Sequence, residues 1–391
     1  MKTTLKNNTL TICLEGRIDT NNAQAAEAEL IAAVDANPGA ETVIDAAELE
    51  YISSAGLRAL MKLRKKVGKT LPVLNVSSEV YEIFEVTGFT ELLDVHKRMR
   101  ELSVEGCELI GSGGFGKVYR IDPETIVKVY SPTITLDMVQ HERDTAQKAF
   151  LAGVPTAISY DVVRCGDCYG VVFELLNARS FTKILTDEPQ KLDWCVEEFV
   201  ALLKKIHGTV VPEGKLKDIK ETVLYWVSTM QSCLPADAAE KLLALVQAVP
   251  HDNHMIHGDY HTKNIELQND EVLLIDMDTL SVGNPVFEFA HIYNSLIGFS
   301  EWDHEHIKRF QGYDFETAKN FWTKTLAAYL ETKDEAEIRK TEEKIRIVSY
   351  TRLLSRSIRR REYETETGSH EFGLWKSELL ELLDKTDTLL F

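Results

Sequence analysis

The sequence lacks the features that mark membrane, nucleic-acid-binding and secreted proteins. Acidic residues outnumber basic ones, with 62 Asp and Glu against 44 Lys and Arg, which gives a net charge of −18. Nucleic acids and anionic membrane surfaces repel such a chain, so we expect neither as a partner. No stretch approaches the ~18 consecutive apolar residues that a membrane helix needs. The first residues lack the basic and then apolar pattern of a secretory signal, which predicts a cytoplasmic protein.

Cysteine is also sparse. The 391 residues include six cysteines, far fewer than the disulfide scaffold of a small secreted protein contains. Cys165 and Cys168 form one C-x-x-C pair, whereas a zinc site of this kind needs a second pair at a suitable spacing. We interpret the Gly166-Asp167 step between them as a hairpin turn. No internal repeat and no low-complexity tract is present, which leaves ordinary globular domains.

What the sequence does contain points to more than one domain. Its 391 residues exceed a typical domain of ~150 residues, and a hydrophobic fraction of 44% can build ordinary cores. Residues 1–99 alternate between strand and helix patterns, which predicts an α/β layer with a partly parallel sheet. The expected strands lie at 10–14, 42–45 and 71–76, and the expected helices at 21–34, 55–67 and from 80 onward. A charged stretch at 96–101 is expected to be a linker or a linking helix.

The remainder of the chain has a different character. Residues 102–174 are rich in strand patterns and contain one expected helix, at 136–151. From about residue 181 onward helical patterns dominate. A short region at 255–290 interrupts them and concentrates most of the polar motifs described below.

A pair of serines opens one of the expected helices in the first segment. In Tyr51–Leu57 (YISSAGL), Ser53 or Ser54 can cap this helix by accepting backbone N–H hydrogen bonds. Together with Leu14–Asp19 and Val43–Asp45, this run makes the segment resemble the STAS domain, the fold of bacterial anti-sigma-factor antagonists.

The STAS resemblance implies a protein partner of the anti-sigma type and a regulatory phosphorylation. In that family a partner kinase phosphorylates a serine that precedes a small residue and a glycine, and Ser54 holds that position here. A phosphate would add a charge of about −1.5 to −2 at the helix N-terminus and alter a docking surface there. The family commonly has Asp before this serine, where this chain has Ser53. A partner-binding module without phosphorylation therefore stays an alternative.

Glycines cluster in the second segment. Residues 111–118 fit the pattern G-x-G-x-x-G-x-V through Gly111, Gly113, Gly116 and Val118, and Gly114 adds a fourth glycine inside it. Glycine allows the backbone to approach phosphate oxygens closely and to adopt a positive φ where a tight turn needs it. Such clusters also mark ordinary hairpins, and a dinucleotide-binding turn would lead directly into a helix. Because Val118–Ile121 continues as a strand, the pattern favours a loop that covers a nucleotide.

A lysine and a glutamate follow the glycines. Lys128 lies between two valines in an expected strand, where it can neutralise nucleotide phosphates. The alternative is a lysine on the solvent face of the strand. Glu142 belongs to the expected helix at 136–151 and can pair with Lys128; otherwise it is a solvated charge.

A third cluster combines two aspartates and an asparagine. Residues 257–265 read HGDYHTKNI, and Asp276 follows twelve residues after Asn264. Asp259 in a loop can orient a hydroxyl nucleophile or accept its proton. The side-chain oxygens of Asn264 and Asp276 suit Mg²⁺, the ion that accompanies nucleotides. Each residue alone would be an ordinary polar loop residue, but the complete order of Gly-loop, Lys, Glu, Asp, Asn and Asp is hard to obtain by chance.

The complete set resembles the protein-kinase-like fold, and within it the branch of aminoglycoside phosphotransferases and choline kinases. The HGD form at 257–259 in place of H-R-D and the run VGNPVFEFA at 282–290 carry the narrower resemblance. It implies an α+β bilobal domain with a helical C-lobe. The boundaries that follow are a STAS-like domain at 1–99, a linker at 100–105, an N-lobe at about 106–176 and a C-lobe at about 177–391.

The resemblance also implies a role for each matching residue. Asp259 is the expected catalytic aspartate, and Asn264 and Asp276 are the expected metal ligands. Lys128 and Glu142 form the expected pair that anchors the phosphates of ATP. The other expected contributors are the glycine loop around the nucleotide, Glu174 in the hinge that contacts adenine, and the supporting residues His257, His261 and Asp278.

Two positions depart from the family pattern. Met277-Asp278 stands where an aromatic and a small residue are commoner, and Glu288 stands where Asp is usual. Neither change removes the catalytic aspartate or a metal ligand, so we expect an active enzyme. Asp278 is either a second acidic group near the metal or an exposed turn residue.

The sequence therefore predicts an Mg²⁺-dependent transfer of the ATP γ-phosphoryl group to a hydroxyl of a small molecule such as an aminoglycoside or an aminoalcohol. The acidic helical half would suit a cationic acceptor. We expect the arginines between Arg352 and Arg361 to form a solvated or ion-paired face. The alternative function is signalling in an anti-sigma partner-switching pathway, in which the kinase-like domain senses nucleotide or phosphorylates a protein serine such as Ser54.

Overall fold

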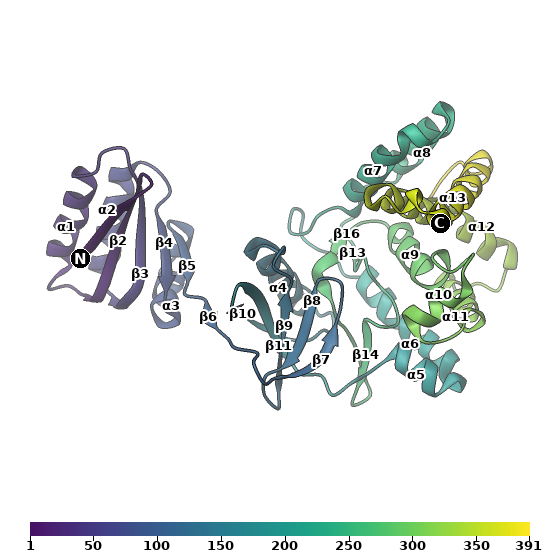
Figure 1. Ribbon diagram of the computed structural model, residues 1–391, viewed down its shortest axis with the longest axis horizontal. Helices are drawn as coiled ribbons and strands as arrows, with labels where there is room; N and C mark the ends of the chain where they lie inside the picture. The colour runs from purple at the N-terminus through teal and green to yellow at the C-terminus, as the bar shows by residue number, and fades with distance from the viewer. The chain divides into compact units, whose positions relative to one another are not determined.

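The computed structural model describes residues 1–391, which divide into two compact units (Figure 1). The first unit consists of Met1–Ser103 with Val163–Gly166, and the second of Val104–Val162 with Asp167–Phe391. No helix in either unit combines the length and the apolar character that crossing a membrane requires.

The first unit is built on one five-stranded sheet with the strand order β1-β2-β3-β4-β5. The first two strands pair antiparallel, and the other neighbours pair in parallel. The strands are β1 (Lys2–Lys6), β2 (Thr9–Ile18), β3 (Glu41–Ile52), β4 (Pro72–Val76) and β5 (Asp94–Lys97). The helices between them are α1 (Ala23–Asp35), α2 (Ser54–Val67) and α3 (Ser78–Val86).

Alternating burial explains how this sheet forms. Leu10, Ile12 and Leu14 of β2 are buried while the residues between them are more exposed, which is the period of a strand with one covered face. Helix α2 buries Leu57 and Leu60 in the same core and turns its basic residues outward. The predicted α/β fold of this segment is confirmed.

The ends of this sheet differ from the sequence expectation. Every residue of β1 is exposed and the strand pairs only with β2, so its sequence carries no alternating pattern. A linking helix at 96–101 is wrong, because this stretch contains the end of β5 and a two-residue strand, β6 (Arg100–Glu101). The backbone N–H of Arg98 donates to the carbonyl of Val76 at 2.7 Å, so sheet pairing already satisfies groups that a helix would have used. A helix would also have brought its neighbouring basic residues together on one face.

The strand-rich part of the second unit is built on a sheet in which the strands follow the order β10-β11-β9-β8-β7. The strands after β6 are β7 (Glu108–Ser112), β8 (Gly116–Arg120), β9 (Thr125–Tyr130), β10 (Ser159–Cys165) and β11 (Cys168–Glu174). Helix α4 (Leu136–Leu151) has the predicted bounds and packs its buried Val139 against Val171 of β11. The predicted hairpin turn at Gly166-Asp167 joins β10 to β11 and is confirmed, with Gly166 at φ +61°.

The rest of the second unit is mainly helical, as predicted. Its helices are α5 (Phe181–Asp187), α6 (Leu192–His207), α7 (Ile219–Met230), α8 (Ala236–Ala248), α9 (Pro285–Tyr293), α10 (His304–Gln311), α11 (Phe315–Leu330), α12 (Glu335–Arg360) and α13 (Glu366–Lys385). Five short strands form two small sheets among them: β12 (Arg179–Ser180), β13 (Met255–Ile256), β14 (Ile265–Gln268), β15 (Glu271–Leu274) and β16 (Ser281–Val282). One hydrophobic core joins these helices. The second unit therefore has a strand-rich lobe and a helical lobe, the predicted bilobal kinase-like fold.

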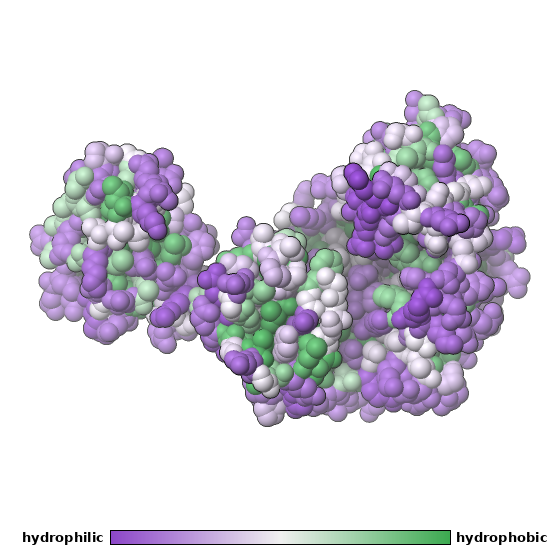
Figure 2. Space-filling view, in the orientation of Figure 1, coloured by the Kyte–Doolittle hydropathy of each residue, from purple (hydrophilic) through white to green (hydrophobic).

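Hydrophilic side chains cover most of the face shown in Figure 2, and an apolar patch lies over the sheet of the strand-rich lobe. Leu109, Ile110 and Phe115 are large apolar side chains of this region that stay exposed. They belong to the hairpin of β7 and β8, which carries the glycine-rich loop.

We expect Leu60→Ala to destabilise the first unit without lowering the free energy of unfolding of the second. Leu60 is fully buried in the core of the first unit, so its truncation should lower that unit's free energy of unfolding by about 2–5 kcal/mol. Urea unfolding of the whole chain, followed by circular dichroism and by tryptophan fluorescence, measures the effect, because all five tryptophans lie beyond residue 190. The control Leu5→Ala changes an exposed leucine and should leave both transitions in place. A shift of the fluorescence transition by Leu60→Ala would show that the units do not unfold independently.

Candidate functional site

A cavity of about 520 Å³ opens between the glycine-rich hairpin and the loop that follows β15. Segments 110–116, 173–176 and 275–277 supply much of its wall. The expected nucleotide-binding residues all line it, together with one expected metal ligand: Gly111, Gly113, Gly114, Gly116, Val118, Lys128, Glu142, Glu174 and Asp276. The cavity is therefore the place where the sequence motifs of the strand-rich lobe converge.

The glycines of this hairpin matter because they have no side chain, and their φ angles are not unusual. None of the four has a positive φ, contrary to what the motif suggested. A Cβ atom on Gly116 would lie 2.2 Å from the carbonyl oxygen of Val129, so only glycine allows β8 to approach β9 at this point. No atom lies within 4 Å of the Cβ positions of Gly113 and Gly114, so the backbone of these two residues is open next to the cavity.

Lys128 lies at the centre of an ion-paired triad in the cavity. Its Nζ donates to Oε1 of Glu142 at 2.8 Å and to Oδ1 of Asp276 at 2.6 Å. Burial alone would lower the pKa of Lys128, but the two carboxylates outweigh it and raise the pKa above its usual range. The ammonium group therefore stays charged at any physiological pH. The predicted pairing of Lys128 with Glu142 is present, and the pairing with Asp276 was not foreseen.

The loop after β13 holds Asp259 next to a histidine. Nε2 of His261 lies 3.5 Å from Oδ2 of Asp259, and Nδ1 of His261 accepts from the backbone N–H of Lys263 at 3.3 Å. Burial would raise the pKa of Asp259, but the hydrogen bond from His261 and the charge of Arg352 hold it below its usual range. The Asp259 side chain remains 40% exposed. It is thus an ionised carboxylate that can be reached from outside the protein.

A buried carboxylate fixes the backbone of this loop. Glu288, with none of its surface exposed, accepts from the backbone N–H of His257 at 2.6 Å and of Gly258 at 3.0 Å. The imidazole of His257 then accepts from the N–H of Asp259 at 3.2 Å and donates from Nε2 to the carbonyl of Ile275 at 3.2 Å. His257 thereby ties Asp259 to the residue before Asp276.

Two further residues complete the polar centre. The amide nitrogen of Asn264 donates to the backbone carbonyl of Asp259 at 2.9 Å, and Ile275 N–H donates to the carbonyl of Asn264 at 2.9 Å. This leaves the side-chain oxygen of Asn264 without a hydrogen bond. Asp276 itself adopts the left-handed region at φ +67°, a strained conformation for a non-glycine residue that is typical of functional sites.

The donor set suits a hard cation in part. No group of three or more His, Cys, Asp or Glu side chains forms a metal site, so a cation here would need further oxygen ligands from a nucleotide. Asp278 is half-buried rather than an exposed turn residue. Burial and the carboxylates of Asp276 and Glu142 raise its pKa to about 7. A cation bound nearby would favour its ionised form.

Glu174 lines the cavity, and its side chain is hydrogen-bonded within the protein. Its carboxylate accepts from the backbone N–H of Ile158 at 2.8 Å, and the N–H of Leu175 donates to the carbonyl of Glu124 at 2.7 Å. The N–H of Leu176, which also lines the cavity, makes no hydrogen bond within the protein. The backbone of this segment therefore offers one free donor to a ligand, the N–H of Leu176, two residues beyond Glu174.

Sequence reasoning missed two charged residues of the cavity. Lys263 and Glu266 both line it; Lys263 places its Nζ over the Phe310 ring at 4.4 Å. Burial raises the pKa of Glu266 to about 7. Lys263 lies inside the HGDYHTKNI run and was readable as a basic residue near the phosphates, whereas nothing in the sequence of β14 indicates that Glu266 is buried.

The serine pair of the first unit is divided between two roles. Ser53 is the N-cap of α2, and its Oγ accepts from the backbone N–H of Gly56 at 3.4 Å. Ser54 is the first helical residue, is exposed, and makes no side-chain hydrogen bond. The structural cap thus needs only Ser53, which leaves the hydroxyl of Ser54 free.

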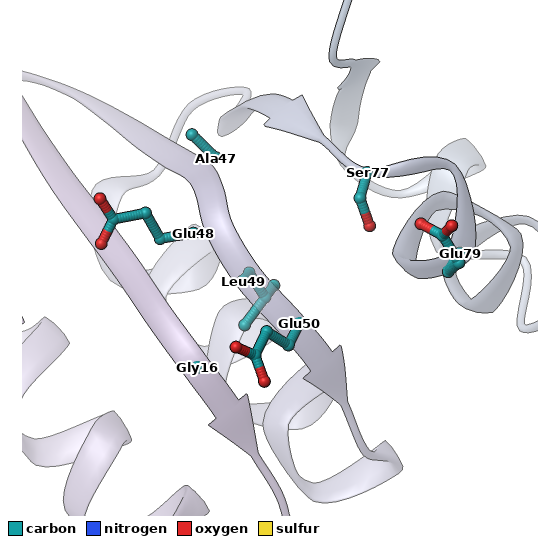
Figure 3. Close-up of a pocket in the computed structure, with 7 residues that line it drawn as sticks. All are labelled: Gly16, Ala47, Glu48, Leu49, Glu50, Ser77 and Glu79. Atoms are coloured by element: carbon teal, nitrogen blue, oxygen red, sulfur yellow. The ribbon is translucent and has the colours of Figure 1, made fainter.

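A separate depression of about 630 Å³ lies on the first unit. Figure 3 shows Glu48 and Glu50 on β3 and Ser77 and Glu79 at the start of α3 around it. Carboxylates are the only charged groups in its wall, so it does not suit a phosphate-bearing ligand.

We expect Gly258→Ala to disrupt the loop that carries Asp259. Gly258 has φ +82°, and a Cβ atom there would lie 2.7 Å from the carbonyl of Thr279. Gly214 makes a matched control, since it has φ +77° but no atom within 4 Å of its Cβ position. Urea unfolding should show a loss of about 1 kcal/mol for Gly214→Ala from the φ strain alone, and a clearly larger loss for Gly258→Ala. Equal losses would contradict the importance of the close approach.

Comparisons with known proteins agree with the two-part organisation. The family model of the phosphotransferase enzyme family matches residues 107–321, and the STAS domain model matches residues 1–94. A putative anti-sigma factor antagonist, BtrV of Bordetella bronchiseptica, is 37% identical over 89 residues, which cover 22% of this chain and 76% of that protein.

Solved structures of two kinases cover a large part of this chain at low sequence identity. The ADP-bound aminoglycoside phosphotransferase APH(2'')-Ib has a TM-score of 0.49 at 15% identity and covers 77% of this chain and 98% of its own. Amicoumacin kinase hAmiN has a TM-score of 0.48 at 14% identity, with 78% of this chain and 94% of its own covered. The phosphotransferase match takes in more than half of the 391 residues. The chain therefore belongs to the phosphotransferase enzyme family and carries a STAS domain of the anti-sigma-factor-antagonist type in residues 1–94.

Proposed function

We propose that the protein transfers the γ-phosphoryl group of ATP to a hydroxyl group of an acceptor, with Mg²⁺ bound to the nucleotide. The observation that carries this proposal is the triad of Lys128, Glu142 and Asp276 in a cavity that a glycine-rich hairpin lines. A buried, permanently charged lysine next to such a hairpin is suited to nucleotide phosphates. The proposed functional parts are residues 1–99 and 106–391, joined by a linker at 100–105, in a cytoplasmic protein.

The cavity offers a binding partner to each part of ATP. The adenine would contact the apolar wall near Phe173 and accept a hydrogen bond from the N–H of Leu176. The phosphates would lie under Gly113 and Gly114, where the absence of side chains allows a close approach, and near the ammonium group of Lys128. Lys128 would then exchange its bond to Asp276 for one to phosphate while Glu142 keeps it in place.

The proposed metal ligands are the free side-chain oxygen of Asn264 and the carboxylate of Asp276, with Asp278 as a nearby acidic group. Mg²⁺ bound there would neutralise negative charge on the phosphates. The hydrogen bond from the Asn264 amide to the carbonyl of Asp259 orients this side chain with its oxygen as the free end. Asp276 is exposed enough, at 38%, to reach a ligand.

The proposed chemistry centres on Asp259. The acceptor hydroxyl oxygen forms a bond to the γ-phosphorus, the bond between that phosphorus and the β–γ bridging oxygen breaks, and ADP leaves. The hydroxyl proton passes to a carboxylate oxygen of Asp259 and then to solvent. His261 approaches Oδ2 of Asp259, and the acceptor would bind at the other oxygen. Small hydroxyl compounds are the proposed acceptors, with aminoglycosides and aminoalcohols as the class that the sequence suggested.

We expect Asp259→Asn to reduce phosphoryl transfer by about 10²–10⁴-fold while the Kd for ATP changes little. The amide cannot take the hydroxyl proton, but it leaves the nucleotide cavity intact. Product formation from γ-labelled ATP and a nucleotide titration measure the two quantities, each with and without Mg²⁺. Asp270→Asn is the matched control, since Asp270 is exposed in the turn between β14 and β15. Wild-type turnover by the Asp259 variant would exclude this residue as the catalytic aspartate.

We propose, as a second function, that the STAS domain binds a protein partner of the anti-sigma type and that phosphorylation of Ser54 controls the contact. The free, exposed hydroxyl of Ser54 next to the capping Ser53 supports a modification site. The likeness to a putative anti-sigma factor antagonist supports the kind of partner. A phosphate at the N-terminus of α2 would interact favourably with the helix dipole and change the charge of the surface.

We expect mass spectrometry of the protein after incubation with ATP and Mg²⁺ to find phosphate on Ser54 and none on Ser53. Ser54→Ala should abolish the modification with little loss of stability. Ser53→Ala should retain it but cost about 1 kcal/mol in the unfolding of the first unit, because the cap is lost. The variant Asp259→Asn distinguishes self-phosphorylation, which it should abolish, from phosphorylation by a contaminating kinase, which it should not affect. If the intact protein gains no phosphate while a small molecule does, its own kinase domain does not operate this switch.

A further inference from the structure

Three helices of the second unit converge beside the loop that carries Asp259. Glu288 of α9 binds the backbone of that loop, and His291 lies three residues later, so it faces the same side of the helix. The ring of His291 is 5.7 Å from the ring of Trp226 on α7. The guanidinium of Arg352 on α12 lies 6.0 Å from the centroid of the same Trp226 ring.

Hydrogen bonds between the helices hold this arrangement in register. Oγ of Ser349 on α12 donates to the carbonyl of Ala290 on α9 at 3.2 Å, one turn before Arg352. Oγ1 of Thr229 on α7 donates to Oγ of Ser355 on α12 at 2.7 Å, one turn after Trp226. Both neighbours of α12 are thus fixed on the side of the helix from which Arg352 projects.

Two polar groups in this cluster have no partner in the protein. His291 is 6% exposed, and neither of its ring nitrogens has a hydrogen-bond partner. Arg352 is partly buried and has no carboxylate within 4.0 Å, whereas Arg356, one turn later on the same helix, pairs with Glu362 at 3.0 Å. Leaving buried polar groups unpaired is costly, so a ligand that satisfies both would gain affinity from them.

The electrostatics give the cluster a positive sign. Burial lowers the pKa of Arg352 to about 10, and the guanidinium therefore still carries its charge at neutral pH. Burial and the charge of Arg352 hold the pKa of His291 well below its usual range, so this imidazole is neutral and can both donate and accept a hydrogen bond. Helix α9 carries both His291 and the Glu288 that binds the loop of Asp259, so the cluster lies on the side of this loop, and the charge of Arg352 helps to lower the pKa of Asp259.

The positive charge continues along α12 toward its C-terminus. Arg356 and Arg359 follow Arg352 at spacings of four and seven residues, on one face of the helix. Arg359 lies over the ring of Tyr225 on α7 at 6.0 Å and has no carboxylate partner. The expectation of a solvated or ion-paired arginine face is thus correct for Arg356 and wrong for Arg352.

We propose that Arg352, His291 and Trp226 form the acceptor subsite of this phosphotransferase, and that the acceptor is a small hydroxyl compound bearing a carboxylate or phosphate group. The proposal rests on the phosphoryl transfer proposed above. The bonds formed and broken in that reaction, and the transfer of the hydroxyl proton to Asp259, stay the same. Arg352 would bind the anionic group and the neutral His291 a neighbouring polar atom, while the Trp226 ring forms an apolar wall. A polycationic aminoglycoside would instead meet a guanidinium group that has no carboxylate within 4.0 Å, a repulsion that selects against it.

The test starts from the charge of the acceptor. Bacterial metabolites are separated on anion-exchange and cation-exchange resins, and each fraction is incubated with the full chain, Mg²⁺ and γ-labelled ATP. We expect labelled product only from the fraction that the anion exchanger retains. Inorganic sulfate, added at constant ionic strength, should inhibit in competition with this fraction. Product from the cationic or neutral fraction alone would overturn the anionic acceptor and leave the phosphotransferase function standing. Product from no fraction would contradict the proposed function itself.

Variants then locate the subsite. Arg352→Gln should raise the KM for the anionic acceptor by about tenfold to 100-fold and remove inhibition by sulfate, with the KM for ATP unchanged within about twofold. Arg352→Lys keeps the charge and should recover part of the loss, which also covers the case that the glutamine variant does not fold. Arg339→Gln, at an exposed position of the same helix, is the matched control and should behave like the wild type. An unchanged acceptor KM in a folded Arg352→Gln would overturn the assignment of this residue.

Discussion

The catalytic half of the molecule depends on one buried carboxylate. Glu288 has no exposed surface, and its two oxygens accept from the successive backbone N–H groups of His257 and Gly258. A buried carboxyl group is tolerated when its oxygens accept hydrogen bonds, as both oxygens of Glu288 do, and in return it determines the path of the loop. His257 extends this order to Asp259 and to the loop before Asp276. One side chain of α9 thus relates the two aspartates of the proposed reaction.

Local charge, rather than the charge of the whole chain, governs what this protein can bind. The chain carries −18, yet its cavity holds a lysine whose charge two carboxylates maintain. A second positive group, Arg352, acts on Asp259 from α12. Both cations are partly buried, where charges interact more strongly than they do in water. An acidic protein can therefore present positively charged sites, which we propose bind ATP and an anionic acceptor.

A capped helix N-terminus has a different consequence in each of the two units. In the STAS domain Ser53 satisfies the end of α2, so the adjacent Ser54 has no structural duty and stays exposed. In the phosphotransferase unit Asn284 caps α9 through the N–H of Val286, which starts the helix just before Glu288. A cap in one unit leaves a hydroxyl free for modification, and a cap in the other positions the carboxylate that organises the loop.

The sequence by itself determined the fold class, the order of domains and the residues that meet in the cavity of the second unit. Those inferences succeeded because they depend on local patterns: alternating burial in β2, glycine spacing in the hairpin, and the HGD run. Three features were decided only by the tertiary structure. The ion pair between Lys128 and Asp276 joins residues 148 positions apart. The burial of Glu288 depends on packing that leaves no periodic signal, and the cluster of Trp226, His291 and Arg352 comes from three helices whose crossing no sequence pattern specifies. Contacts between distant elements depend on how side chains pack. The hydrophobic periodicity of an element shows which of its faces is buried, but it does not show which residues of another element will contact that face.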